Sequence, residues 1–179
     1  MRKINIYDST LRDGTQGENV NFSVMDKINI VKALDELGVD FIEAGNPFSN
    51  PKDVEFFQKA TSLTLESSQL VAFGSTRRAN TDVLDDASVQ AMKNCPTEYV
   101  AIFGKAWDLH VFDVLKTTAE ENLRMIFDTI KYLTDSGKKV FFDAEHFFDG
   151  YKANPDYAIE VVKTAQKAGA IEAVLCDTN

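Results

Sequence analysis

The stretch SVMDKINIVKALDELGVDFIEAG, residues 23–45, predicts a helix followed directly by a buried strand. Ser23, with Asp26 three residues later, is a plausible N-cap, and Gly38 is a plausible C-cap. The last seven residues, VDFIEAG, are short and apolar, as in a strand of a parallel sheet. Between the caps, one apolar stripe is formed at helical spacing by Val24, Ile28, Val31, Ala33, Leu34 and Leu37.

The same pairing of helix and strand recurs along the whole chain. Strand patterns occur at residues 3–7, 39–45, 69–74, 98–104, 139–145 and 173–178. Besides 23–38, helical patterns occur at about 51–60, 82–94, 118–136 and 155–168. Strands that alternate with helices predict parallel pairing through right-handed crossovers.

The length of each repeat narrows the architecture to part of a barrel. An eight-unit (β/α)₈ barrel uses about 31 residues per unit, so 179 residues hold between five and six units. The last strand has no covering helix, although parallel strands need burial on both faces. We therefore expect an α/β fold, an incomplete (β/α)₈ TIM barrel with strands 1–6 in parallel pairing. Residues 1–179 would be the N-terminal part of a catalytic domain, with strands 7–8 and any regulatory domain absent.

A complete six-stranded, doubly wound open sheet is the alternative architecture. No G-x-G-x-x-G follows the first strand pattern, so the dinucleotide-binding version of that fold has no support.

Composition limits the class of protein and its partners. Apolar residues make up 44% of the chain and charged residues 26%, as in ordinary globular domains. A net charge of −9 and a pI near 4.7 argue against nucleic acid as a partner. Two cysteines and no leader pattern argue against a secreted disulfide scaffold, and the apolar runs are too short to span a membrane. We expect a cytoplasmic protein that binds a small metabolite or another protein.

Charged residues gather at the carboxyl ends of the predicted strands. Arg12 and Asp13 follow the first strand, Glu43 interrupts the apolar second strand, and Asp143 and Glu145 share one face of the fifth. In a barrel, catalytic groups collect at this rim, and a buried acid there needs a partner. The pattern predicts one shared pocket; for the Arg12-Asp13 pair alone, a surface turn remains the alternative.

Several further residues depend on how far the strands extend. Arg12 would share a face with the first strand if the extended run continues that far, and Thr178 would join the rim from the sixth. His110 and His146 are interpreted as structural or supporting residues. The Arg77-Arg78 pair, in the segment after the third strand, is interpreted as part of a solvated loop, and a docking site for an acidic ligand is the alternative.

Four stretches resemble the isopropylmalate and homocitrate synthase family of the DRE-TIM metallolyase superfamily, and most of all its citramalate synthase branch. Together they run over essentially the whole chain, which makes the combination far more specific than LRDG alone. They are YDSTLRDGTQGENVNFSVMDKINIVKALDELGVDFIEAGNPFSNPKD (7–53), IFGKAWDLHV (102–111), FFDAEHFFDGYKANPDYA (141–158) and VLCDTN (174–179).

This resemblance implies a metal-dependent Claisen condensation. Enzymes of the family join acetyl-CoA to a 2-oxo acid, here pyruvate, and the product would be (R)-citramalate, a precursor on a route to isoleucine. Such a parent enzyme is expected to form a homodimer. The alternatives are a sibling synthase that uses another 2-oxo acid, a lyase or carboxyltransferase of the superfamily, and a binding module without catalysis.

By the match of motifs, the resemblance also implies roles for single residues. Asp13 would ligate a divalent metal, and Arg12 would hydrogen-bond the ketone oxygen that the metal polarises. Glu145 and Thr178 would bind substrate and organise the proton transfer that enolises acetyl-CoA. The remaining substrate-binding positions are Gln16, Glu43 and Asp143.

One motif of the family is missing from these residues. Its H-x-H metal ligands occur nowhere in the chain, so Asp13 would be the sole protein ligand for Mg²⁺, Mn²⁺ or Zn²⁺. We expect the metal to bind the longer parent and to bind these 179 residues weakly or not at all. The chain alone is therefore expected to be inactive, and its open strand edges would invite self-association.

Overall fold

The computed structural model describes residues 4–49 and 51–178 and contains one sheet of six parallel strands. The strands lie in chain order, without the reversal that a doubly wound sheet requires, which confirms the predicted partial (β/α)₈ barrel. Their bounds are β1 (Tyr7–Asp8), β2 (Phe41–Gly45), β3 (Gln69–Ser75), β4 (Tyr99–Lys105), β5 (Lys139–Glu145) and β6 (Glu172–Leu175).

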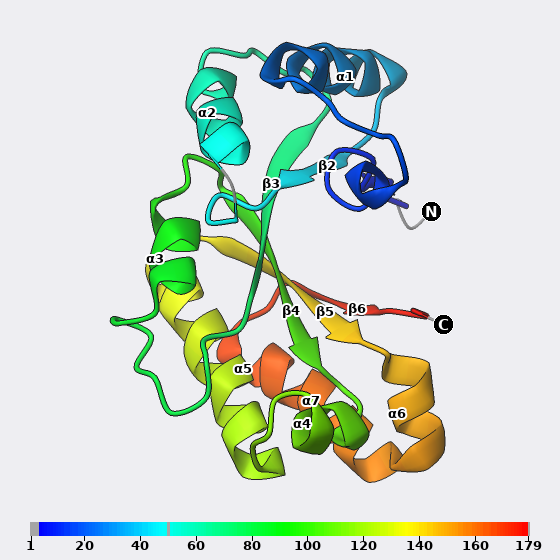
Figure 1. The fold of residues 1–179 in the computed structure, drawn as a ribbon, viewed down its shortest axis with the longest axis vertical. Coiled ribbons are helices and arrows are strands. Elements are labelled where there is room, and N and C mark those ends of the chain that lie inside the picture. Colours follow the sequence, from blue (N-terminus) through cyan, green and yellow to red (C-terminus); the bar gives the residue numbers. More distant parts are fainter. Residues whose placement is uncertain (1–3, 50, 179) are drawn as a thin grey trace.

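Helices surround the outside of the curved sheet, and both chain ends lie toward the opposite, open side (Figure 1). The helices are α1 (Val24–Leu37), α2 (Pro51–Ala60), α3 (Ala87–Asn94), α4 (Asp108–Asp113), α5 (Ala119–Asp135), α6 (Phe147–Ala153) and α7 (Pro155–Ala168), with a short 3₁₀ helix η1 (Gly14–Gln16).

The ends of the longer helices follow the capping residues of the sequence. The Ser23 side chain accepts a hydrogen bond from the backbone N–H of Asp26, whose carboxylate accepts one from Ser23 N–H, so α1 begins with a capping box. Gly38 ends α1 in the left-handed conformation at φ +86°. At α7, Asn154 is the N-cap before Pro155.

The two faces of the sheet carry different sets of buried side chains, because side chains alternate along each strand. Strand residues that face outward, such as Ile42, Ile102 and Phe142, are fully buried beneath the helices in the main core. The inward face carries a second, mostly aromatic cluster. Its members are Val71, Ala101 and Phe141, with Phe41, Phe73 and Tyr99 packed against them.

Two expectations about where an element begins or ends are wrong, each for a local reason. The first strand ends at Asp8, since the chain turns where the N–H groups of Arg12 and Asp13 both donate to the Ser9 carbonyl. The expected shared face of Arg12 with that strand therefore does not form. Helix α3 begins at Ala87 instead of residue 82, because the preceding Asp86 caps it.

The remaining differences are short elements. Helices α4 and α6 lie in segments that the sequence pattern predicts as connections, and β6 ends at Leu175 instead of residue 178.

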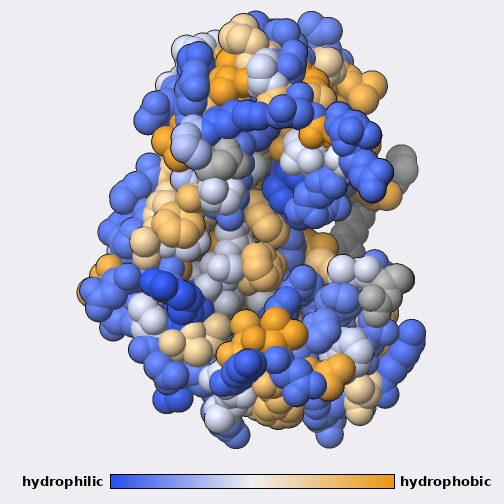
Figure 2. All heavy atoms as spheres, in the orientation of Figure 1, coloured by the Kyte–Doolittle hydropathy of each residue, from blue (hydrophilic) through white to orange (hydrophobic). Residues whose placement is uncertain are grey.

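Apolar residues gather on the surface over α4 (Figure 2), where Leu109 and Phe112 are exposed. Across residues 4–49 and 51–178, no helix has the length and apolar content that a membrane crossing needs.

Candidate active site

A hollow of about 780 Å³ lies on the inner side of the curved sheet. It is bounded by strands β1, β2, β5 and β6, so residues distant in the chain face one space. Its lining includes Tyr7, Arg12, Phe41, Glu43, Phe141, Asp143 and Cys176. In this hollow, charged groups from the first, second and fifth strand units come together.

Arg12 and Tyr7 both bond to the buried carboxylate of Glu43. The Tyr7 hydroxyl donates to Glu43 Oε2 at 2.6 Å, and Arg12 Nε donates to Glu43 Oε1. The Glu43 side chain is only 1% exposed, so these two donors satisfy an acid that would otherwise be costly to bury. The predicted need of Glu43 for a partner is explained by this pair of contacts.

The guanidinium of Arg12 is fixed on further sides. Its central carbon lies 3.9 Å from the centroid of the Phe73 ring, which stacks on Phe103 at 5.5 Å. Nη1 donates to Asp13 Oδ1 at 2.9 Å. Within the described part of the chain Nη2 has no hydrogen-bond partner. The side chain is therefore held rigidly by several contacts and keeps one donor nitrogen for a ligand.

Two acids on the inner face have raised pKa values. Burial raises the pKa of Glu43, while the bonds from Tyr7 and Arg12 oppose that rise. Burial, followed by the nearby charge of Glu43, raises the pKa of Asp143 to about 7. Burial and the charge of Asp143 raise the pKa of Cys176 to about 12, which keeps this thiol protonated and unreactive. The site can therefore hold a proton on Asp143 near neutral pH.

Glu145 and Thr178 lie at the carboxyl rim beside this hollow. Glu145 pairs with Lys105, which lies directly opposite it in the register of β4 and β5. The hydroxyl oxygen of Thr178 accepts a hydrogen bond from the backbone N–H of His146 at 3.3 Å. His146 therefore connects the two residues, since it follows Glu145 in the sequence and its N–H bonds to Thr178.

The other predicted site residues remain on the exposed loop after β1. Asp13 is 61% exposed at its side chain and contacts Arg12. Gln16 is exposed in η1 and makes no side-chain hydrogen bond within the described residues. Residues 4–49 and 51–178 contain no group of three or more His, Cys, Asp or Glu that could hold a metal.

Sequence reasoning missed two members of the site. Side chains alternate between the two faces of a strand, and Tyr7 lies at a position of β1 whose side chain points inward. Lys105 lies on the same face of the fourth strand as Phe103. Assigning alternate residues to the two faces of every strand, and not only of the strands that carry acids, could have found both residues.

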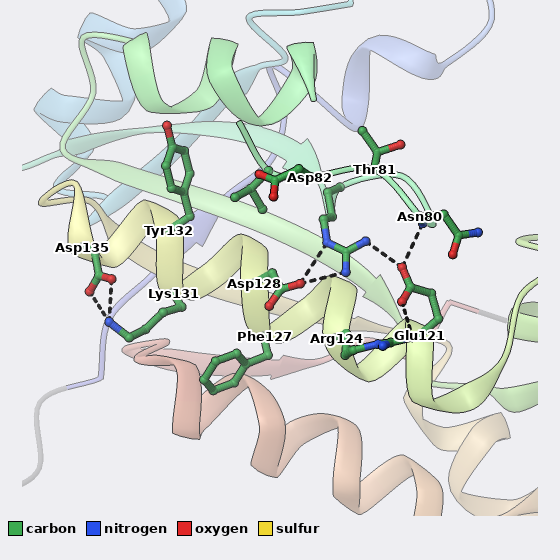
Figure 3. Close-up of a pocket in the computed structure, with 12 residues that line it drawn as sticks. Asn80, Thr81, Asp82, Glu121, Arg124, Phe127, Asp128, Lys131, Tyr132 and Asp135 are labelled. Atoms are coloured by element: carbon green, nitrogen blue, oxygen red, sulfur yellow. Dashed lines mark hydrogen bonds and ion pairs between the residues drawn. The ribbon is translucent and has the colours of Figure 1, made fainter. Parts of the chain in front are cut away.

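A second hollow, of about 620 Å³, lies on the outside between α5 and the segment after β3 (Figure 3). Asp128 and Glu121 flank the guanidinium of Arg77, at 2.8 Å from Nη2 and 2.7 Å from Nη1. Arg77 is only 5% exposed, so its predicted place in a solvated loop is wrong, whereas the side chain of Arg78 is 74% exposed, as predicted for such a loop. Glu121 also accepts from the Asn80 N–H and from Arg124. These charges are paired with one another and brace the segment after β3 against α5.

The comparison with protein families identifies the chain. Residues 3–179 match the family model described as HMGL-like. The chain belongs to the HMGL-like family. This confirms the resemblance predicted from the motifs, and relatives within the synthase branch agree with it.

Relatives of this HMGL-like chain match it almost from end to end. It is 55% identical over 177 residues to the (R)-citramalate synthase of Aquifex aeolicus, covering 99% of this chain and 34% of that protein. For the (R)-citramalate synthase of Synechocystis the identity is 53%, covering 97% and 32%. A homocitrate synthase of Saccharolobus islandicus is 38% identical, covering 99% and 37%. The chain spans about a third of the length of these curated relatives.

Solved structures support the fold of this HMGL-like chain. Hydroxymethylglutaryl-CoA lyase from Pseudomonas aeruginosa superposes with a TM-score of 0.74 at 20% identity, over 98% of this chain and 58% of that one. An HMG-CoA lyase from Acinetobacter baumannii, solved with coenzyme A and 3-methylmalate, gives 0.71 at 17% identity, over 98% and 56%. At these identities the likeness shows the fold alone.

Proposed function

We propose that residues 1–179 are the N-terminal part of the catalytic barrel of a citramalate synthase. The observation that carries this proposal is the gap in identity between two kinds of relatives. Five (R)-citramalate synthases are 48% to 55% identical across the chain, whereas the homocitrate synthases reach 38%. The proposed activity also requires what the other two thirds of such relatives contribute, and it would serve isoleucine synthesis in the cytoplasm.

The proposed reaction joins acetyl-CoA and pyruvate. A proton leaves the acetyl methyl group, and that carbon forms a new bond to the ketone carbon of pyruvate. The ketone oxygen takes up the negative charge and then a proton. Water cleaves the carbon–sulfur bond of the thioester, which releases coenzyme A as a thiol and leaves (R)-citramalate.

Arg12 is the residue proposed to stabilise the charge on the ketone oxygen. Its Nε is engaged by Glu43 and its Nη1 by Asp13, so the guanidinium is preorganised while Nη2 remains available. A donor that is fixed before reaction needs no reorganisation when charge develops. Lysine could not supply this arrangement, because its single ammonium lacks the planar fork.

The inner acids are proposed to handle substrate and protons. Glu145, paired with Lys105, and Thr178 beside it would bind substrate and organise removal of the acetyl proton. Asp143, whose pKa lies at about 7, would donate a hydrogen bond to substrate in its protonated form. Glu43 would act through Arg12, and Gln16 would contact substrate from the exposed loop.

Asp13 is proposed as one ligand of a divalent metal. Its exposed carboxylate offers the oxygen ligand that Mg²⁺ or Mn²⁺ prefers. The described residues contain no group of three or more possible ligands, so the other ligands would come from the remaining two thirds of the longer enzyme.

An exchange of segments tests the proposal. The matching third of the Aquifex aeolicus enzyme is replaced by residues 1–179 of this chain, and release of thiol from acetyl-CoA is measured with pyruvate or with 2-oxoglutarate. We expect thiol release that depends on pyruvate, and citramalate as the product. A folded chimera that is inactive, or that prefers 2-oxoglutarate, would overturn the proposal. Should the whole exchange not fold, an exchange of residues 4–49 alone gives the same readout.

A further inference from the structure

The two histidines of the chain lie ring against ring at the carboxyl rim. His110, in α4, and His146, at the end of β5, meet edge to face with ring centroids 4.6 Å apart at 88°. Trp107 packs on both rings, at 4.8 Å from His110 and 6.2 Å from His146. We call His110 and His146 the rim histidine pair. Both Nδ1 atoms are buried without a hydrogen-bond partner in the described chain, and Nδ1 of His146 lies 3.7 Å from Oδ2 of Asp149.

The backbone at His146 is strained. It has φ +53° and ψ +38°, a left-handed conformation that is uncommon for residues with a side chain. This turn separates Glu145 at the end of β5 from Phe147 at the start of α6. Such a conformation persists only where the surroundings hold it.

The same turn makes the connection between β5 and β6 at the rim. The N–H of His146 donates to Thr178 Oγ1 at 3.3 Å, and the N–H of Phe147 donates to the Cys176 carbonyl at 3.2 Å. Since His146 directly follows Glu145, its backbone fixes the position of Thr178 relative to Glu145.

The ends of β5 and β4 are also joined to each other, and the ring contact lies just beyond that junction. The Ala106 N–H donates to the Glu145 carbonyl at 3.2 Å, and Lys105 pairs with the Glu145 carboxylate. Beyond these contacts the two strands lead into α4 and α6. The rim histidine pair joins α4 to the residue that precedes α6, and the hydrogen bond from Asn154 Nδ2 to Asp108 Oδ2 at 2.9 Å joins the same two segments farther along.

We propose that the rim histidine pair positions Glu145 and Thr178, with His146 holding the turn and His110 holding the ring of His146. The inference rests on the proposed roles of Glu145 and Thr178. It assigns to the histidines no contact with substrate. Their action is to keep a carboxylate and a hydroxyl in one arrangement, to which proton transfer is sensitive.

The surroundings of His110 favour its neutral form. Burial, then His146, then Lys105 lower the pKa of His110, while Glu145 and Asp149 oppose this. Two protonated rings at 4.6 Å would repel each other, so the packed arrangement requires that at least one ring is neutral.

The first test measures positioning directly in the 179-residue chain. His110→Asn removes the supporting ring and leaves the His146 turn in place. We expect the backbone amide of His146 to exchange with deuterium at least about tenfold faster, while amides in the middle of β5 keep their rates. Phe112→Ala, on an exposed position of the same helix, is the control and should change neither. Equal exchange at His146 in both variants would overturn the inference.

The second test uses activity in the chimera. His146→Asn keeps the N–H and tolerates the left-handed turn, but lacks the ring. We expect kcat to fall by roughly 10- to 100-fold with KM for pyruvate nearly unchanged, and the double variant with His110→Asn to be no worse than the single ones. If the unsubstituted chimera is active and His146→Asn matches it, the inference fails alone. If the unsubstituted chimera is folded and inactive, the proposed function fails, and the exchange measurement still decides positioning.

Discussion

Arg12 donates through Nε to the buried Oε1 of Glu43, and this contact joins the loop after β1 to the middle of the neighbouring strand. The two residues are 31 positions apart in the sequence. Because Glu43 is nearly inaccessible and Arg12 is 22% exposed, the pair anchors a cation at the boundary between core and hollow. A guanidinium that is anchored on one edge can present its other edge to an anion.

Arg12→Lys should abolish most of the proposed activity without unfolding the protein. Lysine can still neutralise Glu43, but it cannot also present a fixed donor toward the hollow. In the chimera we expect kcat for citramalate formation to fall by about 100-fold or more, with the melting temperature changed by only a few degrees.

The matched control for that change is Arg78→Lys. Arg78 is a second arginine of the chain, and its side chain is 74% exposed. Its replacement should leave kcat within about twofold, because exposed ion pairs contribute little. If Arg12→Lys behaves like Arg78→Lys, Arg12 does not act on the ketone oxygen.

Asp143→Asn should change how stability depends on pH. The folded protein keeps a proton on Asp143 up to about pH 7, whereas the unfolded chain loses it near the ordinary value of 3.8. Asp143 therefore favours the folded state most below pH 4, and this contribution is lost as the pH rises toward 7. Asparagine cannot ionise. We expect urea unfolding at pH 8 to give the variant a free energy of unfolding higher by on the order of 1 to 3 kcal/mol, and near equality at pH 4.

The control for Asp143→Asn is Asp177→Asn, which alters an exposed carboxylate two residues beyond β6. It should shift the free energy of unfolding by less than about 0.5 kcal/mol at either pH. A wild-type stability that is flat from pH 4 to pH 8 would show that Asp143 ionises in the folded state as it does in the unfolded one.

Much of the fold could be predicted because it rests on local signals. The capping box at Ser23, the glycine at residue 38 and the apolar stripe between them define α1 by short-range chemistry. The strand order follows from repetition of one unit. Helices α4 and α6 could not be predicted in this way, since they are only six and seven residues long and carry too few turns for a periodic pattern.

The candidate site was predictable in part. Strand parity correctly placed Glu43 and Asp143 on the inward face, because β2 and β5 are regular up to those residues. Parity failed for Arg12, since the chain leaves the extended conformation after Asp8. The hydrogen bond from Arg77 to Asp128 joins positions 51 residues apart. It could not be predicted from composition, because a solvated loop and a loop held by such a contact contain the same kinds of residue. Such contacts depend on tertiary packing.

Asp13→Ala should weaken metal binding in the chimera. Asp13 is the exposed carboxylate proposed as a ligand, and removal of one ligand should raise the Kd for Mn²⁺ by roughly 10- to 100-fold in calorimetric titration. Glu18→Ala, an exposed acid on the same loop, should leave the Kd unchanged. In the 179-residue chain we expect weak binding, and tight stoichiometric binding there that is lost in Asp13→Ala would contradict an incomplete site.

Gly150→Ala should destabilise the rim more than its small size suggests. A Cβ at Gly150 would lie 2.4 Å from the Ala106 carbonyl oxygen and 2.9 Å from Trp107 Cα, and these are backbone atoms that cannot turn aside. Helix α6 must therefore move away from the end of β4, which also separates α6 from Trp107. We expect the free energy of unfolding to fall by about 2 to 3 kcal/mol.

Gly14→Ala is the matched control for Gly150→Ala, because its added Cβ would meet nothing closer than Thr10 Cγ2 at 3.7 Å, an ordinary contact. It should change the free energy of unfolding by less than about 0.5 kcal/mol. Urea unfolding followed by circular dichroism compares the two variants directly. Equal stability would mean that α6 can shift freely, and a rim with that freedom could not hold Glu145 and Thr178 in one arrangement.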